Sequence, residues 1–224
     1  IETGKTILEL GPLWLWSGQR VLERIRTVEG QQIWQAAVEQ GRGAIAITPH
    51  LGAWEVAGLY ISAHWPITTL YRPSRLGLDE LIRTGRERLG ARTVPTDPRG
   101  VKALFQALKK GQVLGILPDQ DPGRGNGVFA PFFGVPANTM GLLSRLAIKT
   151  QAPVLLLVAE RLPRGKGYRL RFTPLPEAVN QEPLEASVAA VNRAVEAAVR
   201  QRPEQYLWAY KRYKTRPEGE RRLY

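Results

Sequence analysis

The chain has 224 residues, no cysteine, two histidines and a formal net charge of +12, and 43% of its residues are hydrophobic. This length and composition predict one folded domain over residues 1–224 rather than a disordered chain. The lack of cysteine excludes disulfides and thiolate metal sites, and no apolar run reaches the roughly 18 to 20 residues of a membrane-spanning helix.

Two segments carry almost all of the net charge. Residues 72–110 contain ten Lys or Arg against four Asp or Glu, and residues 200–224 contain eight against three. Localised positive charge suits an anionic partner such as a phosphate-bearing lipid, a membrane surface, an acidic protein or a nucleic acid. Basic helix faces kept for solubility explain each segment equally well when it is taken alone.

The hydrophobic pattern predicts helices and strands that alternate along the chain. The first forty residues, which include a short helix over 30–43, are expected to be helical throughout. Strands are expected at 44–48, 67–72, 91–97, 113–121, 153–161 and 168–176, and further helices at 51–63, 78–90, 100–112, 139–151 and 184–203. This alternation predicts an α/β fold with a mostly parallel central sheet flanked by helices, in which the last two strands form an antiparallel hairpin.

Ligands of such sheets gather at the carboxyl ends of the strands. Polar residues follow three of the predicted strands at such ends, namely His50, Arg72, and Asp119 with Gln120. These side chains are therefore candidates for a site, although strand ends are also where polar residues ordinarily return.

The stretch IAITPHLGAWE (45–55) places a histidine after an apolar strand and a glutamate five residues later. Five residues of regular helix turn the chain by about 500°, so the two side chains would not meet within one helix. They can meet if His50 lies in a turn, which Gly52 permits, and Glu55 in the first turn of the next helix. A carboxylate on one imidazole nitrogen orients the other as a general base, so we predict a catalytic His50–Glu55 pair. A purely structural histidine is the competing interpretation.

Two further segments predict substrate contacts. Arg72, Arg75, Arg83 and Arg86 form a cluster of guanidinium groups of the kind that clamps phosphates, although solvated arginines have the same pattern. In residues 128–137, VFAPFFGVPA, Phe132 and Phe133 are expected to line an apolar groove, with core packing as the competing interpretation. No nucleotide-loop, zinc-protease or serine-hydrolase motif is present, and we expect neither a cofactor nor a metal.

The ordered motifs resemble those of the lipid A biosynthesis acyltransferases, the lauroyl/myristoyl transferase branch of the lysophospholipid acyltransferase superfamily. They are the H-x4-E of HLGAWE, then YRP…RERLG, LPDQD…VFAPFFG and N-x3-E…PEQYLWAYKRYK. The last motif contains Asn192, Glu196, Trp208, Arg212 and Lys214. The resemblance covers nearly the whole chain and departs at Pro49, where many relatives carry asparagine.

This resemblance implies a glycerol-phosphate-acyltransferase-like fold and a mechanism. His50, oriented by Glu55, would remove a proton from a hydroxyl of a phosphorylated glycolipid, whose oxygen would attack the thioester of an acyl-acyl carrier protein. Arg72 and Arg86 would hold acceptor phosphates, and Asp119 with Gln120 would shape the pocket. The expected place of work is the cytoplasmic face of the bacterial inner membrane, in lipopolysaccharide biosynthesis.

Two other functions remain open at this stage. One is acyl transfer to another lysophospholipid or phosphoglycolipid; the other is a non-catalytic basic module that binds membranes. No nucleic-acid-binding motif is present, so we expect no nucleic-acid partner. Since the chain starts at Ile1 and its one methionine is Met140, we also expect that the hydrophobic membrane-docking segment with which such proteins usually begin is missing.

Overall fold

The structure is a computed structural model that describes residues 2–71, 77 and 79–224. Arg72 and Arg75, two of the arginines predicted to bind phosphate, lie outside the described residues.

The structure contains one large sheet and one separate two-stranded ribbon. Their strands are β1 (Ile25–Glu29), β2 (Ala44–Ile47), β3 (Ile67–Tyr71), β4 (Arg92–Pro95), β5 (Val113–Ile116), β6 (Gly127–Phe132), β7 (Val135–Met140), β8 (Val154–Arg161) and β9 (Tyr168–Pro174). The helices are α1 (Glu2–Leu15), α2 (Gly18–Leu22), α3 (Gln31–Glu39), α4 (Trp54–His64), α5 (Asp79–Glu87), α6 (Pro98–Lys109), α7 (Leu142–Thr150) and α8 (Leu184–Gln201), with short 3-10 turns at Pro163–Gly165, Glu177–Asn180 and Pro203–Gln205.

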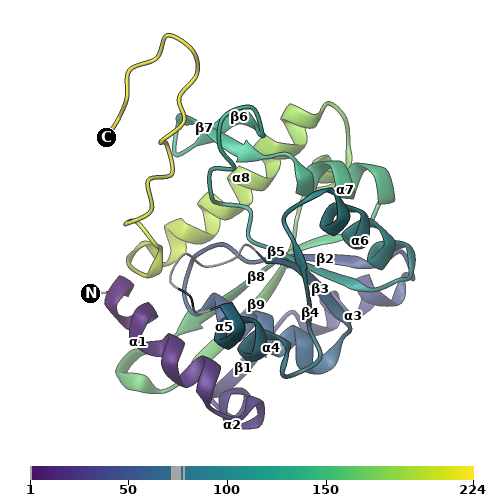
Figure 1. The fold of residues 1–224 in the computed structure, drawn as a ribbon, viewed down its shortest axis with the longest axis vertical. Helices are drawn as coiled ribbons and strands as arrows, with labels where there is room; N and C mark the ends of the chain where they lie inside the picture. The colour runs from purple at the N-terminus through teal and green to yellow at the C-terminus, as the bar shows by residue number, and fades with distance from the viewer. Residues whose placement is uncertain (1, 72–76, 78) are drawn as a thin grey trace.

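The large sheet has the strand order β1-β9-β8-β2-β5-β3-β4. Every neighbouring pair in it is parallel except β8 and β9, which form an antiparallel hairpin. Helices α6, α7 and α8 cover one face of this sheet, whereas α2, α3 and α4 cover the other with α1 and α5 packed outside them (Figure 1). The predicted α/β fold with a mostly parallel sheet is therefore confirmed, as is the terminal hairpin.

The unbroken apolar run of residues 44–47 forms β2, a central strand of the sheet that is covered on both faces. Ile45 and Ile47 belong to the core on the α6–α8 face, and Ala44 and Ala46 belong to the core beneath α4. All four residues are fully buried, as expected for a strand covered on both faces. The small alanines on the second face allow α4 to pack close to the sheet.

Two predicted boundaries were wrong. The expected helix over the first forty residues is interrupted by β1, which runs parallel to β9. Without β1, β9 would present an unpaired edge, and pairing outweighs local helix propensity. The helix expected over 139–151 begins only at Leu142, because Thr139 and Met140 pair with β6 in the two-stranded ribbon.

The ribbon β6–β7 is fastened to α8 by buried polar contacts. The Asn192 amide donates to the Pro131 carbonyl at 3.1 Å and to the Thr139 hydroxyl at 3.1 Å. The ribbon turns at Phe133, which has a φ of +49°, and the Phe133 amide donates to Glu196 at 2.7 Å. Positive φ is unfavourable for a bulky residue, so this contact with α8 helps to hold the turn.

The chain after α8 returns to the same ribbon. Arg212 is only 4% exposed, and its guanidinium donates to the Asn138 carbonyl and the Thr139 hydroxyl, each at 2.6 Å. Asp121 accepts from the Asn138 amide at 2.8 Å and from the Thr215 backbone at 3.0 Å. Arg212, which belongs to the last sequence motif, thus helps to hold the two-stranded ribbon in place beside the sheet.

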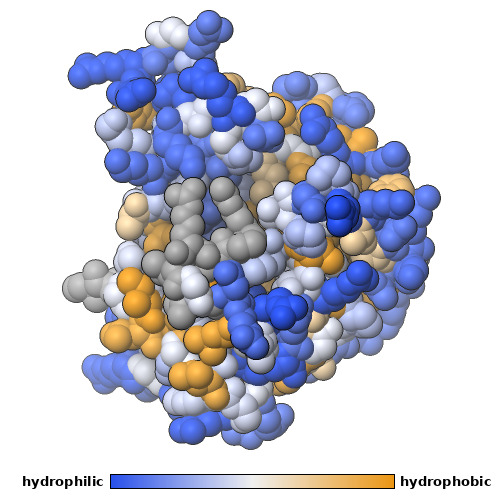
Figure 2. Space-filling model, viewed as in Figure 1, coloured by the Kyte–Doolittle hydropathy of each residue, from blue (hydrophilic) through white to orange (hydrophobic). Residues whose placement is uncertain are grey.

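The surface of α1 is unusually apolar. Ile7, Leu8 and Leu15 are 64%, 78% and 71% exposed, and Figure 2 shows hydrophobic residues gathered over this helix. Among the helices of the described residues, none combines the length and the apolar content needed to cross a bilayer.

The polar contacts of Asn192 give a stability prediction. We expect Asn192→Ala to lower the free energy of unfolding by about 1–3 kcal/mol, because the Pro131 carbonyl and the Thr139 hydroxyl lose a buried donor. Urea unfolding followed by circular dichroism measures this change. The exposed Asn126 serves as control, since Asn126→Ala should change the free energy by less than about 0.5 kcal/mol; equal effects of the two variants would refute the structural role of Asn192.

Candidate active site

The carboxyl ends of β2 and β5 bring the candidate histidine and aspartate together. In the parallel pairing of these strands, Ile47 lies opposite Ile116. His50 and Asp119 each follow three residues later, so the register delivers both to the same edge of the sheet. This is the edge at which ligands of parallel sheets bind.

His50 is held by Asp119 through two contacts. The imidazole Nδ1 lies 2.8 Å from Oδ1 of Asp119, and the backbone N–H of His50 donates to Oδ2 at 2.9 Å. The side chain of His50 is 13% exposed and that of Asp119 is 3% exposed. A carboxylate bonded in this way places a hydrogen on Nδ1 and leaves the lone pair of Nε2 available as a base.

The second imidazole nitrogen faces the next residue of the same loop. The Gln120 amide nitrogen lies 3.1 Å from His50 Nε2, a distance that suits donation to the free lone pair. The Trp54 ring packs against the imidazole, with centroids 5.0 Å apart. Both nitrogens of His50 therefore have partners, and its ring has a fixed orientation.

The charge of Asp119 is stabilised in spite of its burial. Burial alone would raise the pKa of this carboxyl, but the attraction of His50 and the hydrogen bonds from its ring and backbone outweigh burial and lower the pKa. Burial raises the pKa of the neighbouring Tyr206 phenol, and the Asp119 carboxylate raises it further. Asp119 is thus an ionised group beside a neutral phenol.

The predicted hydrogen bond between His50 and Glu55 is wrong. Glu55 is engaged by Arg86 of α5, whose Nε and Nη2 donate to the two carboxylate oxygens at 3.1 and 2.5 Å. Burial alone would lower the pKa of Arg86, but the charge and hydrogen bonds of Glu55 raise it. Because α4 begins at Trp54, Glu55 is already in its first turn and pairs with α5, whereas β5 supplies the carboxylate that reaches the imidazole.

The turn between His50 and α4 depends on Gly52. Its φ is +64°, and a Cβ atom at this position would lie 2.2 Å from the Ala159 carbonyl oxygen. The N–H of Gly52 donates to the Gln205 carbonyl at 3.1 Å, and that of Ala53 to the Ala159 carbonyl at 2.8 Å. These two N–H groups already donate to carbonyl oxygens and are therefore not available to bind a negatively charged oxygen of a substrate. In the described part of the chain, the N–H groups of Trp54 and Glu55 have no protein acceptor, as is usual at a helix amino terminus.

A cavity of about 80 Å³ lies between α4 and strands β2, β3 and β5. Its charged lining residues are Glu55 and Arg86, and Thr48, Thr69 and Trp54 add neutral polar groups. Its other lining residues are Ala46, Gly58, Leu59, Ile61, Ile67, Leu70, Ala91, Gly115, Ile116 and Leu117. The cavity is thus mainly apolar, with the Glu55–Arg86 ion pair at its wall.

The remaining predicted substrate residues lie in different surroundings. Arg83 is exposed on α5. Phe132 is 1% exposed in the core, which is the packing interpretation of its motif, and Phe133 lies at the ribbon turn against Trp208. Neither phenylalanine lines the cavity beside Glu55. Across residues 2–71, 77 and 79–224, no cluster of three or more acidic or histidine side chains could hold a metal ion.

Comparison with known proteins gives a consistent family signal. The family model for bacterial lipid A biosynthesis acyltransferases matches residues 2–215. The chain is 35% identical over 225 residues to the lipid A biosynthesis palmitoleoyltransferase of Escherichia coli (strain K12), which covers 99% of this chain and 72% of that protein. It is 32% identical over 230 residues to the lauroyltransferase of the same organism, with 97% and 71% covered, and 27% identical over 211 residues to the myristoyltransferase, with 92% and 60% covered.

The lowered pKa of Asp119 predicts how pH affects stability. The folded state favours the charged carboxylate, so its contribution is fully present above the unfolded pKa of about 3.9 and is lost as pH falls through the lower folded value. We therefore expect Asp119→Asn to reduce the free energy of unfolding more at pH 6 than at pH 3, as measured by urea unfolding.

The control for this effect is the same substitution in a His50→Ala background. Because the His50 ring supplies the largest of the interactions that lower the pKa, the difference between pH 6 and pH 3 should shrink there. A difference that stays the same in both backgrounds would show that the His50 side chain does not stabilise the carboxylate.

Proposed function

Because the chain belongs to the bacterial lipid A biosynthesis acyltransferase family and is thus an acyltransferase, we propose that it acylates a phosphorylated lipid A precursor. The acyl donor is a fatty acyl thioester of acyl carrier protein, and the acceptor group is a hydroxyl of the glycolipid or of one of its hydroxyacyl chains. The observation that carries this proposal is the His50–Asp119 pair at the carboxyl edge of the sheet.

The imidazole acts as a general base. His50 Nε2 takes the proton of the acceptor hydroxyl while the oxygen forms a bond to the thioester carbonyl carbon. The carbon–sulfur bond then breaks, and the leaving sulfur receives the proton from the imidazolium. Asp119, 2.8 Å from Nδ1, stabilises the imidazolium and keeps the ring oriented, so the general base of this proposal is a His–Asp pair.

Gln120 and the start of α4 provide donors for the oxyanion. The Gln120 amide occupies Nε2 at 3.1 Å, so it has to move aside when the acceptor hydroxyl binds, and it is then free to donate elsewhere. The N–H groups of Trp54 and Glu55 lie at the amino end of α4, where backbone donors and the helix dipole favour negative charge. Preorganised donors of this kind stabilise a tetrahedral intermediate.

The cavity beside Glu55 accommodates the donor acyl chain. Its volume of about 80 Å³ is below the roughly 300–1,000 Å³ of typical ligand pockets, so binding of a full chain requires α4 and α5 to separate. The Glu55–Arg86 ion pair joins these two helices. In this proposal Glu55 controls access to the cavity instead of orienting the base.

Charge and surface polarity agree with the proposed partners. The net positive segments at 72–110 and 200–224 complement acidic carrier protein and acceptor phosphates, for which Arg72, Arg75 and Arg83 remain candidates. The exposed apolar residues of α1 suit contact with a membrane surface. In this proposal the enzyme works at the surface of the bacterial inner membrane, on its cytoplasmic face.

Substitution of the two carboxylates separates their roles. We expect His50→Ala to lower kcat by about 10²- to 10⁴-fold, the range of general-base catalysis. Asp119→Asn should also lower kcat strongly, because the imidazolium loses its counter-charge. Glu55→Gln should act mainly on KM for the donor. Steady-state transfer assays on folded variants measure these changes. A larger loss of kcat for Glu55→Gln than for Asp119→Asn would favour the catalytic His50–Glu55 pair that was predicted from the sequence.

The acceptor and donor are tested together by mass spectrometry. We expect lauroyl- or palmitoleoyl-carrier protein and a tetraacyl lipid A precursor to give a product heavier by one acyl group, since the compared relatives use such chains by name. His50→Ala, checked for folding by circular dichroism, is the control for enzymatic transfer. Transfer to lysophosphatidic acid alone would favour another lysolipid acceptor, and unchanged function of His50→Ala would favour a non-catalytic membrane-binding module.

A further inference from the structure

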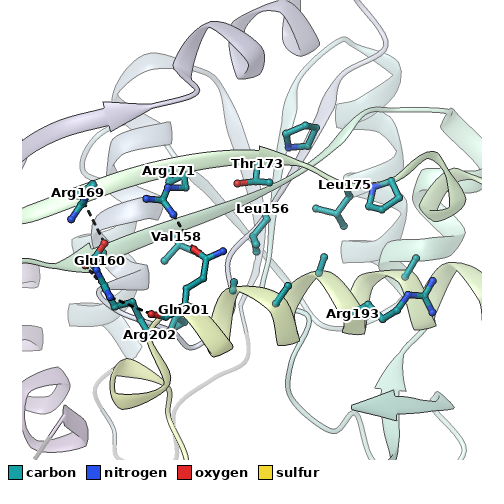
Figure 3. Close-up of a pocket in the computed structure, with 17 residues that line it drawn as sticks. Leu156, Val158, Glu160, Arg169, Arg171, Thr173, Leu175, Arg193, Gln201 and Arg202 are labelled. Carbon is teal, nitrogen blue, oxygen red and sulfur yellow. Dashed lines mark hydrogen bonds and ion pairs between the residues drawn. The ribbon is translucent and has the colours of Figure 1, made fainter. Parts of the chain in front are cut away.

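A second and larger cavity lies on the other face of the sheet. It has a volume of about 350 Å³ and runs between α8 and the β8–β9 hairpin (Figure 3). This volume falls within the range of about 300–1,000 Å³ that is typical of ligand pockets. We call this cavity the α8 groove. The cavity beside Glu55, which we call the α4 cavity, lies beneath α4 on the opposite face of the sheet.

The groove exists because four of the α8 residues that face the sheet here are alanines. The alanines of α8 that line it are Ala190, Ala194, Ala197 and Ala198. Leu156 and Val158 of β8 line it from the sheet (Figure 3). Larger side chains at these positions would fill the space above the sheet. The stretch of α8 from Ala190 to Gln201 is roughly 16 Å long at 1.5 Å per residue, and the groove that follows it has a mainly apolar surface.

Arginines surround this apolar space. Four of them line the groove: Arg169, Arg171, Arg193 and Arg202. Three are paired, since Arg169 and Arg171 contact Glu29 and Arg202 contacts Glu160 at 2.6 Å. The fourth, Arg193, is exposed and makes no hydrogen bond or ion pair with any described residue, and it stands at the opposite end of the groove from Arg202 (Figure 3). Four guanidinium groups against two carboxylates leave the rim positively charged.

The groove reaches the residue that follows the proposed base. Leu51 lines it and is only 1% exposed. The backbone of the loop after α8 is bonded to the same turn, since the Leu207 N–H donates to the His50 carbonyl at 3.0 Å. Apolar cavities thus approach the His50 turn from both faces of the sheet.

We propose that the α8 groove binds one acyl chain of the phosphorylated acceptor lipid, with a phosphate of that lipid at the arginine rim. This inference rests on the proposed function and adds a location to it. Transfer between two lipid-like substrates requires two apolar sites that converge on one base. The lining of the α4 cavity balances Arg86 with Glu55, whereas the α8 groove has four arginines against two carboxylates. The α8 groove therefore suits a phosphate of the acceptor lipid, while the α4 cavity takes the donor chain.

A bulky side chain in the α8 groove tests whether the acceptor binds there. Ala197→Trp places an indole in the groove, and Ala186→Trp adds the same ring at an exposed position of α8 that does not line it. We expect Ala197→Trp to raise KM for a tetraacyl lipid A precursor about tenfold, with kcat and donor KM within about twofold of wild type. Ala186→Trp should change none of these values, and thermal melting identifies any variant that fails to fold.

The charge at the rim is tested separately. Arg193→Gln should raise KM for the diphosphorylated acceptor about fivefold and have less effect on an acceptor without phosphate. Arg145→Gln removes an exposed arginine of α7 outside the groove and should have no effect. If Arg193→Gln and wild type have equal KM values for both acceptors, a phosphate of the acceptor does not bind at the arginine rim.

Direct binding distinguishes failure of this inference from failure of the proposed function. Calorimetry with acceptor alone, without donor, should show weaker binding to Ala197→Trp than to wild type. If wild type transfers nothing but binds acceptor more tightly than Ala197→Trp does, the proposed reaction fails and the groove assignment stands; equal binding by the two proteins overturns the groove assignment. If Ala197→Trp binds acceptor normally but loses affinity for vesicles of phosphatidylglycerol, the groove is a site for membrane lipid and the inference is overturned.

Discussion

The parallel pairing of β2 with β5 is the constraint on which the site depends. Ile47 and Ile116 lie opposite each other in this pairing, and His50 and Asp119 each follow three residues later. The carboxylate of Asp119 therefore reaches the imidazole of His50. A shift of one residue in this register would move the paired isoleucines and alanines to the wrong faces of a fully buried strand. The packing of the core and the geometry of the proposed base are therefore set by the same hydrogen bonds.

The two faces of the sheet are covered by helices of different character. On one face, α4 packs Trp54 against the histidine and is tied to α5 by the Glu55–Arg86 ion pair. On the other face, α8 presents alanines that leave a long groove over β8. The proposed assignment of donor and acceptor to opposite faces rests on this asymmetry, because of the two cavities the α8 groove is the one lined by more arginines than carboxylates.

The sequence was sufficient for the class of fold and for a candidate histidine at the carboxyl edge of the sheet, but not for the hydrogen-bond partner of that histidine. Alternating strands and helices predicted the parallel sheet, and the polar residues at strand ends included both His50 and Asp119. The preference for Glu55 came from its nearness along the chain, whereas the partner lies 69 residues away from His50. Only strand order could reveal that β5 is adjacent to β2. The strand β1 was missed for the same reason, because it forms by pairing with the distant β9.

The turn that holds His50 is completed from the far end of the chain. Its backbone groups are bonded to Ala159, Gln205 and Leu207, which the ribosome adds long after His50 has left the peptidyl transferase centre. A nascent chain that lacks these residues has no partners for Gly52 and Ala53. A chain made only as far as α8 would therefore carry His50 without all of the backbone contacts that fix its turn.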